Sequence, residues 1–505
     1  MTTIEINGNS LTLDQVEQVA LGGAQVALAA TACAQMEASR AVIERLLASG
    51  VIVYGVNTGF GELAEVRISV DQIRQLQLNL VRSHACGVGP ALNQAETRAL
   101  ILLRANALAK GFSGVRPVVV ETLCAMLNAG VHPVIPAKGS VGASGDLAPL
   151  AHLAQVVIGE GEAIFCGEWL AGGEAMRRAG VAPIVLEAKE GISLLNGTQG
   201  MLALLVLALR AAEIAVDTAD VAAALSLDAL RGSPAAFDER IAKARPYAGH
   251  ATTARHLALL NAGSQIRESH RSAEKDPRVQ DAYSLRCVPQ VHGAVRDALL
   301  QVGKTLAIEL NSATDNPLVF AESGEVISGG NFHGQPLAMA ADQLAVALAT
   351  LGGISERRIH HMTNPHTSLL PAFLTSKAGL NSGFMLPQVT AAALASELKT
   401  LATPHSVDSI PASGDQEDYV SMGMSAARRL QPMLENLRNI LAIELLAACQ
   451  GIDLLAPLRT GTEAQKAYDA VRDVSKHVEE DRSLAPDIAA VAELIAAGKF
   501  QKILR

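Results

Sequence analysis

The segment Gly139–Leu150 carries the most distinctive chemistry in the sequence, because it reads Gly-Ser-Val-Gly-Ala-Ser-Gly-Asp-Leu-Ala-Pro-Leu. If the backbone nitrogen of Gly145 approaches the carbonyl carbon of Ala143, the atoms between them close a five-membered ring, and glycine permits that bend because it lacks a Cβ atom. Loss of water leaves an imidazolone, and a second dehydration across Cα and Cβ of Ser144 gives an exocyclic methylidene electrophile. Taken alone, the segment also fits a Gly/Ser loop before a helix.

Further polar clusters lie between apolar helical stretches. A second glycine-rich loop, 54–61, begins with Tyr54, whose phenol could act as a general base if its pKa were lowered. A buried aromatic residue is the alternative there. The other clusters are 195–199, 280–286, 311–317 and 330–335. Because converging helix ends form a pocket, we expect a binding site built from these clusters.

Composition predicts a mostly α-helical chain. Of the 505 residues, 49% are hydrophobic and 18% charged, so the chain can bury a large core and is long enough for two or more packed regions. Only 3% are aromatic, while alanine and leucine dominate, which favours helix over strand. Long helices are predicted at 198–231, 289–314, 335–362, 386–402 and 421–453, forming an antiparallel bundle.

The sequence predicts three parts. Residues 1–196 form an N-terminal domain that carries the tyrosine loop and the Ala-Ser-Gly loop. Residues 197–456 form a central bundle of long helices, and residues 457–505 form a small C-terminal helical region.

Charge and sorting signals limit the partners. The 41 Lys and Arg residues against 50 Asp and Glu give a net charge of −9, which excludes nucleic acid as the expected partner. The uncharged runs 18–36, 191–209 and 378–396 are interrupted by polar residues or proline, so we interpret them as buried helices and expect no membrane partner. No signal peptide and no CxxC pair are found, which predicts a cytoplasmic protein.

A metal site is not predicted. The six cysteines are scattered, and the adjacent His360 and His361 point to different sides of a predicted helix, which is poor geometry for binding one ion. The segment Gly303-Lys304-Thr305 imitates the end of a phosphate-binding loop, but position 298 is alanine and the segment lies inside a predicted helix.

The order of these blocks resembles that of the ammonia-lyases and aminomutases that use a methylidene-imidazolone group. The shared blocks are the triplet, the tyrosine loop, the Asn196 segment, 283–286 and 416–418, and the resemblance runs essentially end to end. It implies that Ala143-Ser144-Gly145 becomes a 4-methylidene-imidazol-5-one with no external cofactor. It also implies an elongated helical bundle with a loop-rich N-terminal domain, assembled as a homotetramer whose active sites draw on more than one subunit.

The resemblance also implies roles for individual residues. The substrate amine would add to the methylidene carbon, the route we favour over attack by the ring, while Tyr54 removes the β-proton. Arg286 would bind the substrate carboxylate bidentately. Asn196 would form a hydrogen bond near that carboxylate or the imidazolone oxygen, and its alternative is a helix N-cap.

Other residues of the same blocks are expected in the pocket. Tyr283 and Gln280 would give further polar contacts, with Tyr283 and Glu417 counted among the catalytic residues. Phe332 offers a face for the substrate ring, or else belongs to the core.

Two residues favour histidine as the substrate. His84, in a Ser-His pair, could form a hydrogen bond with an imidazole, and the Glu417 carboxylate suits a basic ring. A structural histidine and a solvated acidic pair are the alternatives. The expected reaction is non-oxidative elimination of ammonia from L-histidine to trans-urocanate, the first step of histidine degradation. Ser-His and Gly334-Gln335-Pro336 also occur in tyrosine aminomutases, so tyrosine 2,3-aminomutase and tyrosine or phenylalanine ammonia-lyase stay open.

We expect Tyr54→Phe to reduce turnover by about 100-fold or more with the fold intact, because general base catalysis commonly contributes that much. Steady-state kinetics together with circular dichroism measures both effects. Unchanged turnover would remove Tyr54 as the base.

Overall fold

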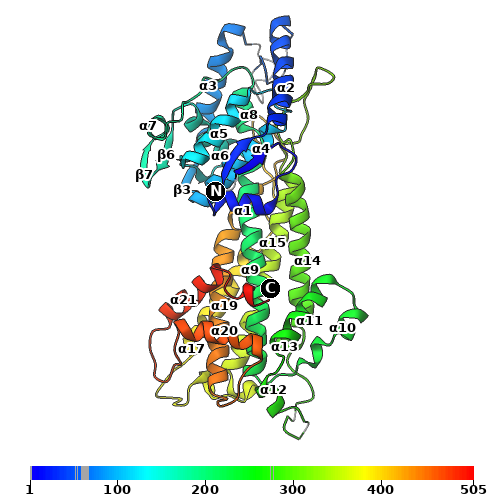
Figure 1. Cartoon of the computed structure of the whole chain (residues 1–505), viewed down its shortest axis with the longest axis vertical. Helices are drawn as coiled ribbons and strands as arrows, with labels where there is room; N and C mark the ends of the chain where they lie inside the picture. The colour runs from blue at the N-terminus through cyan, green and yellow to red at the C-terminus, as the bar shows by residue number, and fades with distance from the viewer. Residues whose placement is uncertain are drawn as a thin grey trace. The chain divides into compact units, whose positions relative to one another are not determined.

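The computed structural model describes residues 3–51, 53, 55–58, 68–272, 274–276 and 278–504 (Figure 1). The described chain is mostly α-helical with short strands, so the predicted fold class is confirmed. It packs as two compact units. Unit 1 comprises 1–207, 303–342 and 404–428, and unit 2 comprises 208–302, 343–403 and 429–505. The three-part division expected from the sequence stays a prediction.

Unit 1 combines helices with small sheets. Its helices are α1 (Leu13–Ala20), α2 (Ala30–Ser49), η2 (Val70–Gln72), α3 (Ile73–His84), α4 (Gln94–Ala109), α5 (Pro117–Ala129), α6 (Leu147–Val157), α7 (Gly172–Ala179), α8 (Glu190–Leu195) and α18 (Gly423–Arg428). Its strands are β1 (Thr3–Ile6), β2 (Gln25–Leu28), β3 (Val88–Ala91), β4 (His132–Pro133), β5 (Pro136–Lys138), β6 (Glu162–Phe165), β7 (Glu168–Ala171), β8 (Leu318–Phe320) and β9 (Glu325–Ile327).

The strands pair locally. β1 and β2 are parallel, with Ile4 opposite Val26, while β3–β5, β4–β6–β7 and β8–β9 are antiparallel. No sheet in the described chain exceeds three strands. The core of unit 1 is therefore helical, and α4 is buried on all sides from Ala99 to Ala109, as expected of a helix without a polar face.

The described part of unit 2 contains helices and loops but no strand. Its own helices are η3 (Pro234–Phe237), α10 (Glu239–Ala244), α11 (Ala248–Leu260), α12 (Gln265–Ser269), α13 (Tyr283–Arg286), α16 (Pro365–Ser368), η4 (Ala372–Leu374), α17 (Met385–Leu401), α19 (Leu430–Asp453), α20 (Thr462–Val474), α21 (Ala485–Ala496) and η5 (Gln501–Ile503). Three of the five unit boundaries fall inside helices, namely α9 (Gln199–Ala229), α14 (Val288–Glu309) and α15 (Gln335–Thr363).

The predicted long helices largely match the structure. Four of them correspond to α9, α14, α15 and α17, although α14 ends at Glu309 instead of 314. The fifth, 421–453, is wrong as a single helix because it is divided into α18 and α19. Met422 adopts a left-handed φ of 55°, so the first of these helices cannot extend back to 421.

Length and composition alone would let α9 and α15 cross a membrane, but core helices pass the same test. In their most apolar stretches, 72% and 61% of the residues are buried inside the protein. Run 191–209 covers the end of α8 and the start of α9, where Met201 to Val206 are buried, in agreement with the interpretation as buried helix. The same interpretation is wrong for run 18–36, because this run contains the strand β2 between α1 and α2.

Candidate active site

The Ala143-Ser144-Gly145 triplet lies in a tight bend immediately before α6. Gly142, Ser144 and Gly145 have φ values of 84°, 56° and 79°, a left-handed region that a serine rarely adopts. Gly142 and Gly145 also pair as an isolated antiparallel bridge. The backbone thus folds back on itself around the residues that were expected to cyclise.

The bend is held against a second segment at Gly197. The Asp146 amide donates to the Gly197 carbonyl oxygen at 2.7 Å, and the Gly197 amide donates to the Ser144 carbonyl oxygen at 3.3 Å. A Cβ atom added to Gly145 would lie 2.1 Å from the Gly197 oxygen, so only glycine fits. From the sequence, the bend was the only reason for a glycine at position 145. The structure adds a second reason, which is the close contact between the Gly145 and Gly197 backbones.

A third segment closes the other side of the bend. The Met422 amide donates to the Val141 carbonyl oxygen at 2.9 Å, and a Cβ atom on Gly142 would lie 2.1 Å from Ser421 Oγ. Sequence reasoning missed Ser421 and Met422. The only available signal was their position a few residues after the recognised 416–418 block.

Asp146 is a buried carboxylate that the sequence analysis also missed. It accepts hydrogen bonds from Ser140 Oγ at 2.9 Å and from the Met201 amide, in the first turn of α9, at 2.7 Å. Burial raises its pKa to about 6, although these hydrogen bonds oppose the shift. It therefore ties the residue after the triplet to the start of α9, where the positive end of the helix dipole favours a carboxylate.

Glu417 lies beside the triplet. Ser144 Oγ donates to Glu417 Oε1 at 3.5 Å, a long hydrogen bond. Burial raises the pKa of the Glu417 carboxyl, and the serine contact opposes that shift. The structure thus brings together two of the predicted catalytic residues.

A cavity of about 200 Å³ connects the triplet with His84. Its lining residues are Ser83, His84, Cys86, Gly139, Ser140, Val141, Ala143, Gly145, Leu147 and Ala148. His84 Nδ1 lies 2.9 Å from the Leu80 carbonyl oxygen, so this nitrogen carries the proton, and burial lowers the pKa of the ring. The Nε2 atom of the neutral ring is then an acceptor.

Asn196 is buried and directly precedes Gly197. Its Nδ2 donates to the Asn316 carbonyl oxygen at 3.1 Å, while Oδ1 has no hydrogen-bond partner in the described structure. A buried unpartnered acceptor is uncommon and fits a site that awaits a ligand. Asn196 follows the last residue of α8, and α9 begins only at Gln199, so the N-cap alternative is wrong.

Three predicted residues belong to unit 2. The Arg286 guanidinium lies over the Tyr283 ring, 4.5 Å from its centroid, and its Nε donates to the Asp281 carbonyl oxygen at 3.0 Å. Tyr283 is 71% exposed, and Gln280 lines a separate polar cavity of unit 2. None of these three side chains is among the described residues that line the His84 cavity of unit 1.

The remaining predicted residues are Phe332 and Tyr54. Phe332, in unit 1, is partly exposed and is not among the described residues that line the His84 cavity. Tyr54 lies outside the described residues. Among those that are described, no cluster of three or more His, Cys, Asp or Glu could hold a metal ion.

Comparison with known proteins defines the class. The model of the aromatic amino acid lyase family matches residues 11–473, so the chain belongs to this family and is a carbon–nitrogen lyase, as predicted. It is 56% identical to histidine ammonia-lyase of Koribacter versatilis, with 100% of both chains covered. It is 53% identical to histidine ammonia-lyase of Anaeromyxobacter dehalogenans, with 99% of this chain and 100% of the relative covered.

Solved structures of ammonia-lyases and aminomutases have a similar fold. Histidine ammonia-lyase from Trypanosoma cruzi has a TM-score of 0.92 at 43% identity, covering 100% of this chain and 95% of that one. Tyrosine aminomutase from Streptomyces globisporus has a TM-score of 0.95 at 39% identity, covering 99% and 98%.

We expect Gly145→Ala to destabilise unit 1 by about 2–4 kcal/mol, because overpacking adds to the cost of a left-handed alanine. Chemical denaturation measures the change. Gly130→Ala is the matched control, since Gly130 has a similar φ of 77° and nothing within 4 Å of the added Cβ atom. Equal losses in both variants would contradict the importance of the Gly197 contact.

Proposed function

We propose that this chain is a histidine ammonia-lyase that converts L-histidine to trans-urocanate and ammonia through a 4-methylidene-imidazol-5-one made from Ala143-Ser144-Gly145. The observation that carries the proposal is the left-handed bend at Ser144, whose neighbours Ala143 and Gly145 line the same cavity as His84. The full-length similarity to histidine ammonia-lyases supports the same reaction.

The ring would form without any added reagent. The Gly145 nitrogen bonds to the Ala143 carbonyl carbon, and that carbonyl oxygen leaves as water with the amide protons of Gly145 and Ser144. The Ser144 Cα proton and hydroxyl leave as a second water, which creates the methylidene double bond. Both steps are dehydrations, so no oxidant or reductant is needed.

The residues present fit this group. The close approach of Gly145 and Gly197 leaves no room for a side chain, and the unpartnered Asn196 Oδ1 lies one residue from Gly197. Once formed, the group supplies an electrophile for the substrate amine, which makes the amine a better leaving group.

The protein residues would bind the substrate and move its protons. Arg286 binds the substrate carboxylate, and Tyr54 removes the β-proton. Tyr283 and Gln280 provide further polar contacts to the substrate. Neutral His84 accepts the imidazole N–H through Nε2, and Glu417 offers a second polar contact to that ring. Phe332 contributes an apolar face.

The exposed position of Tyr283 suits a residue that serves another copy of the chain. We therefore propose a homotetramer with shared active sites. As expected from the sequence, we also propose that the protein works in the cytoplasm, with no nucleic-acid or membrane partner.

A tyrosine 2,3-aminomutase is the second candidate, with tyrosine or phenylalanine ammonia-lyase as further members of the family. The structural similarity to tyrosine aminomutase and the Gly334-Gln335-Pro336 pattern favour it. The identity to that protein, 39%, is lower than the 56% to a histidine ammonia-lyase.

Replacing Ser144 with alanine should abolish turnover, because the second dehydration needs the serine hydroxyl. Intact-mass measurement should show a deficit of two water molecules in the wild-type chain and no methylidene group in Ser144→Ala. A fully active Ser144→Ala protein would exclude the mechanism.

Incubation with L-histidine, L-tyrosine and L-phenylalanine distinguishes the candidates. We expect a conjugated acid from histidine, detected by ultraviolet absorbance, and no β-amino acid by chromatography. His84→Leu should reduce kcat/KM for histidine by about 10-fold or more, since a lost buried hydrogen bond costs about 1–3 kcal/mol. β-Tyrosine as the main product would instead establish the aminomutase.

A further inference from the structure

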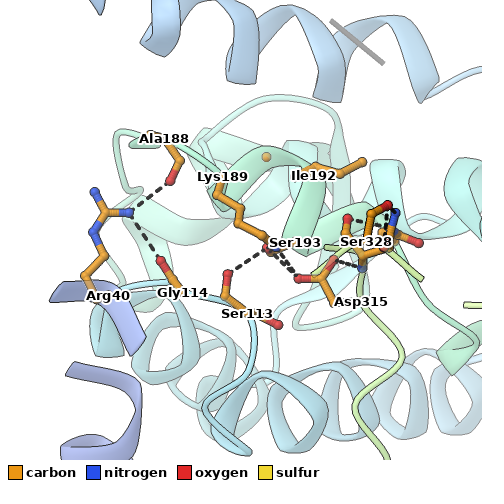
Figure 2. A network of polar contacts seen from close by, with 12 residues as sticks. Arg40, Ser113, Gly114, Ala188, Lys189, Ile192, Ser193, Asp315 and Ser328 are labelled. Carbon is orange, nitrogen blue, oxygen red and sulfur yellow. Dashed lines mark hydrogen bonds and ion pairs between the residues drawn. The ribbon is translucent and has the colours of Figure 1, made fainter. Parts of the chain in front are cut away.

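A group of buried polar residues lies beside α8 and connects it to residue 315 (Figure 2). Lys189, at the N-cap of α8, places Nζ 2.7 Å from Asp315 Oδ2 and 3.0 Å from Ser193 Oγ. Ser193 Oγ donates to the same Asp315 oxygen at 2.7 Å. Lys189 and Ser193 are fully buried and Asp315 is 3% exposed. Because desolvation offsets the attraction in such a pair, stability alone gives a weak reason for it.

Arg104 on α4 adds a second buried cation. Its Nη1 donates to the Asn196 carbonyl oxygen at 2.8 Å and to Gln199 Oε1 at 2.6 Å, and its Nη2 contacts the Ser193 carbonyl oxygen. Burial lowers the pKa of Arg104 to about 10, so it stays charged at neutral pH. The planar guanidinium thus holds Ser193, Asn196 and Gln199, which lie on both sides of Gly197 in the sequence.

We call Arg104, Lys189, Ser193 and Asp315 the buried charge network. Two routes connect this network with Asn196 and Gly197. The direct route is contact, since a Cβ atom on Gly197 would lie 2.5 Å from Arg104 Nη1. The other route passes through Asn316, whose amide donates to Asp315 Oδ1 at 2.7 Å and whose carbonyl oxygen accepts from Asn196 Nδ2 at 3.1 Å.

We propose that the buried charge network is a positioning device that holds the Gly197 backbone against Ser144 and Gly145, and so sets the rate of ring closure in the triplet. This inference rests on the proposed function. Ring closure requires the Gly145 nitrogen to reach the Ala143 carbon, and a misplacement of about 1 Å can cost about 100-fold in rate. Charge-assisted hydrogen bonds resist such displacement better than neutral ones.

The test compares two arginine variants. Arg104→Lys keeps the charge but loses the planar fork that reaches Ser193, Asn196 and Gln199 together. Arg358→Lys is the control, because Arg358 is also fully buried and makes a bidentate ion pair with Glu444, but in unit 2. The full-length proteins are synthesised in a cell-free reaction, and the loss of two water molecules is followed by intact mass while circular dichroism follows folding.

We expect Arg104→Lys to slow water loss by about tenfold or more after folding, with kcat per cyclised chain unchanged. A rate equal to that of wild type or of Arg358→Lys overturns the proposal. If Arg104→Lys fails to fold, Ser193→Ala decides, because it removes only the hydroxyl between Lys189 and Asp315. An unchanged rate in Ser193→Ala then overturns the proposal. A wild-type chain that loses no water refutes the proposed function instead.

Discussion

The contact between the Gly145 and Gly197 backbones is the constraint on which the candidate site depends. Two hydrogen bonds join the segments, and a single methyl group on Gly145 would collide with the Gly197 oxygen. Such proximity is possible because Gly145 has no side chain, and it accompanies the left-handed bend at Ser144. Two further hydrogen bonds hold the same segment, one from the Met201 amide to Asp146 and one from the Met422 amide to the Val141 carbonyl oxygen.

Local sequence was sufficient to predict a chemistry for the triplet. The reactivity expected of Ser144 and Gly145 follows from the order of backbone atoms alone, which needs no tertiary structure. The long helices were equally accessible because apolar periodicity is a local signal. The position of His84 in the cavity wall agrees with the expectation drawn from the family resemblance, although its role in binding stays a proposal.

Tertiary contacts were not predictable in this way. Ser421 lies against Gly142 although 279 positions separate the two residues in the sequence, and no periodicity links them. The ion pair of Lys189 with Asp315 joins residues that each resemble ordinary surface charges in the sequence. Burial alone distinguishes them, and burial follows from the packing of the whole unit. The start of α18 was misplaced because a left-handed Met422 has no signature in composition.

The walls around the triplet come from three stretches of the chain, and this has a consequence for biosynthesis. The stretch that contains Met422 emerges from the ribosome after residues 143–145, so a nascent chain lacks the Met422–Val141 hydrogen bond of the bend until residue 422 has been synthesised. On the proposed mechanism, a truncated or misassembled polypeptide would remain chemically inert. The reactive alkene would then form only in chains that have already folded around the triplet. Amines and thiols of the cell would therefore not meet this electrophile on unfolded chains.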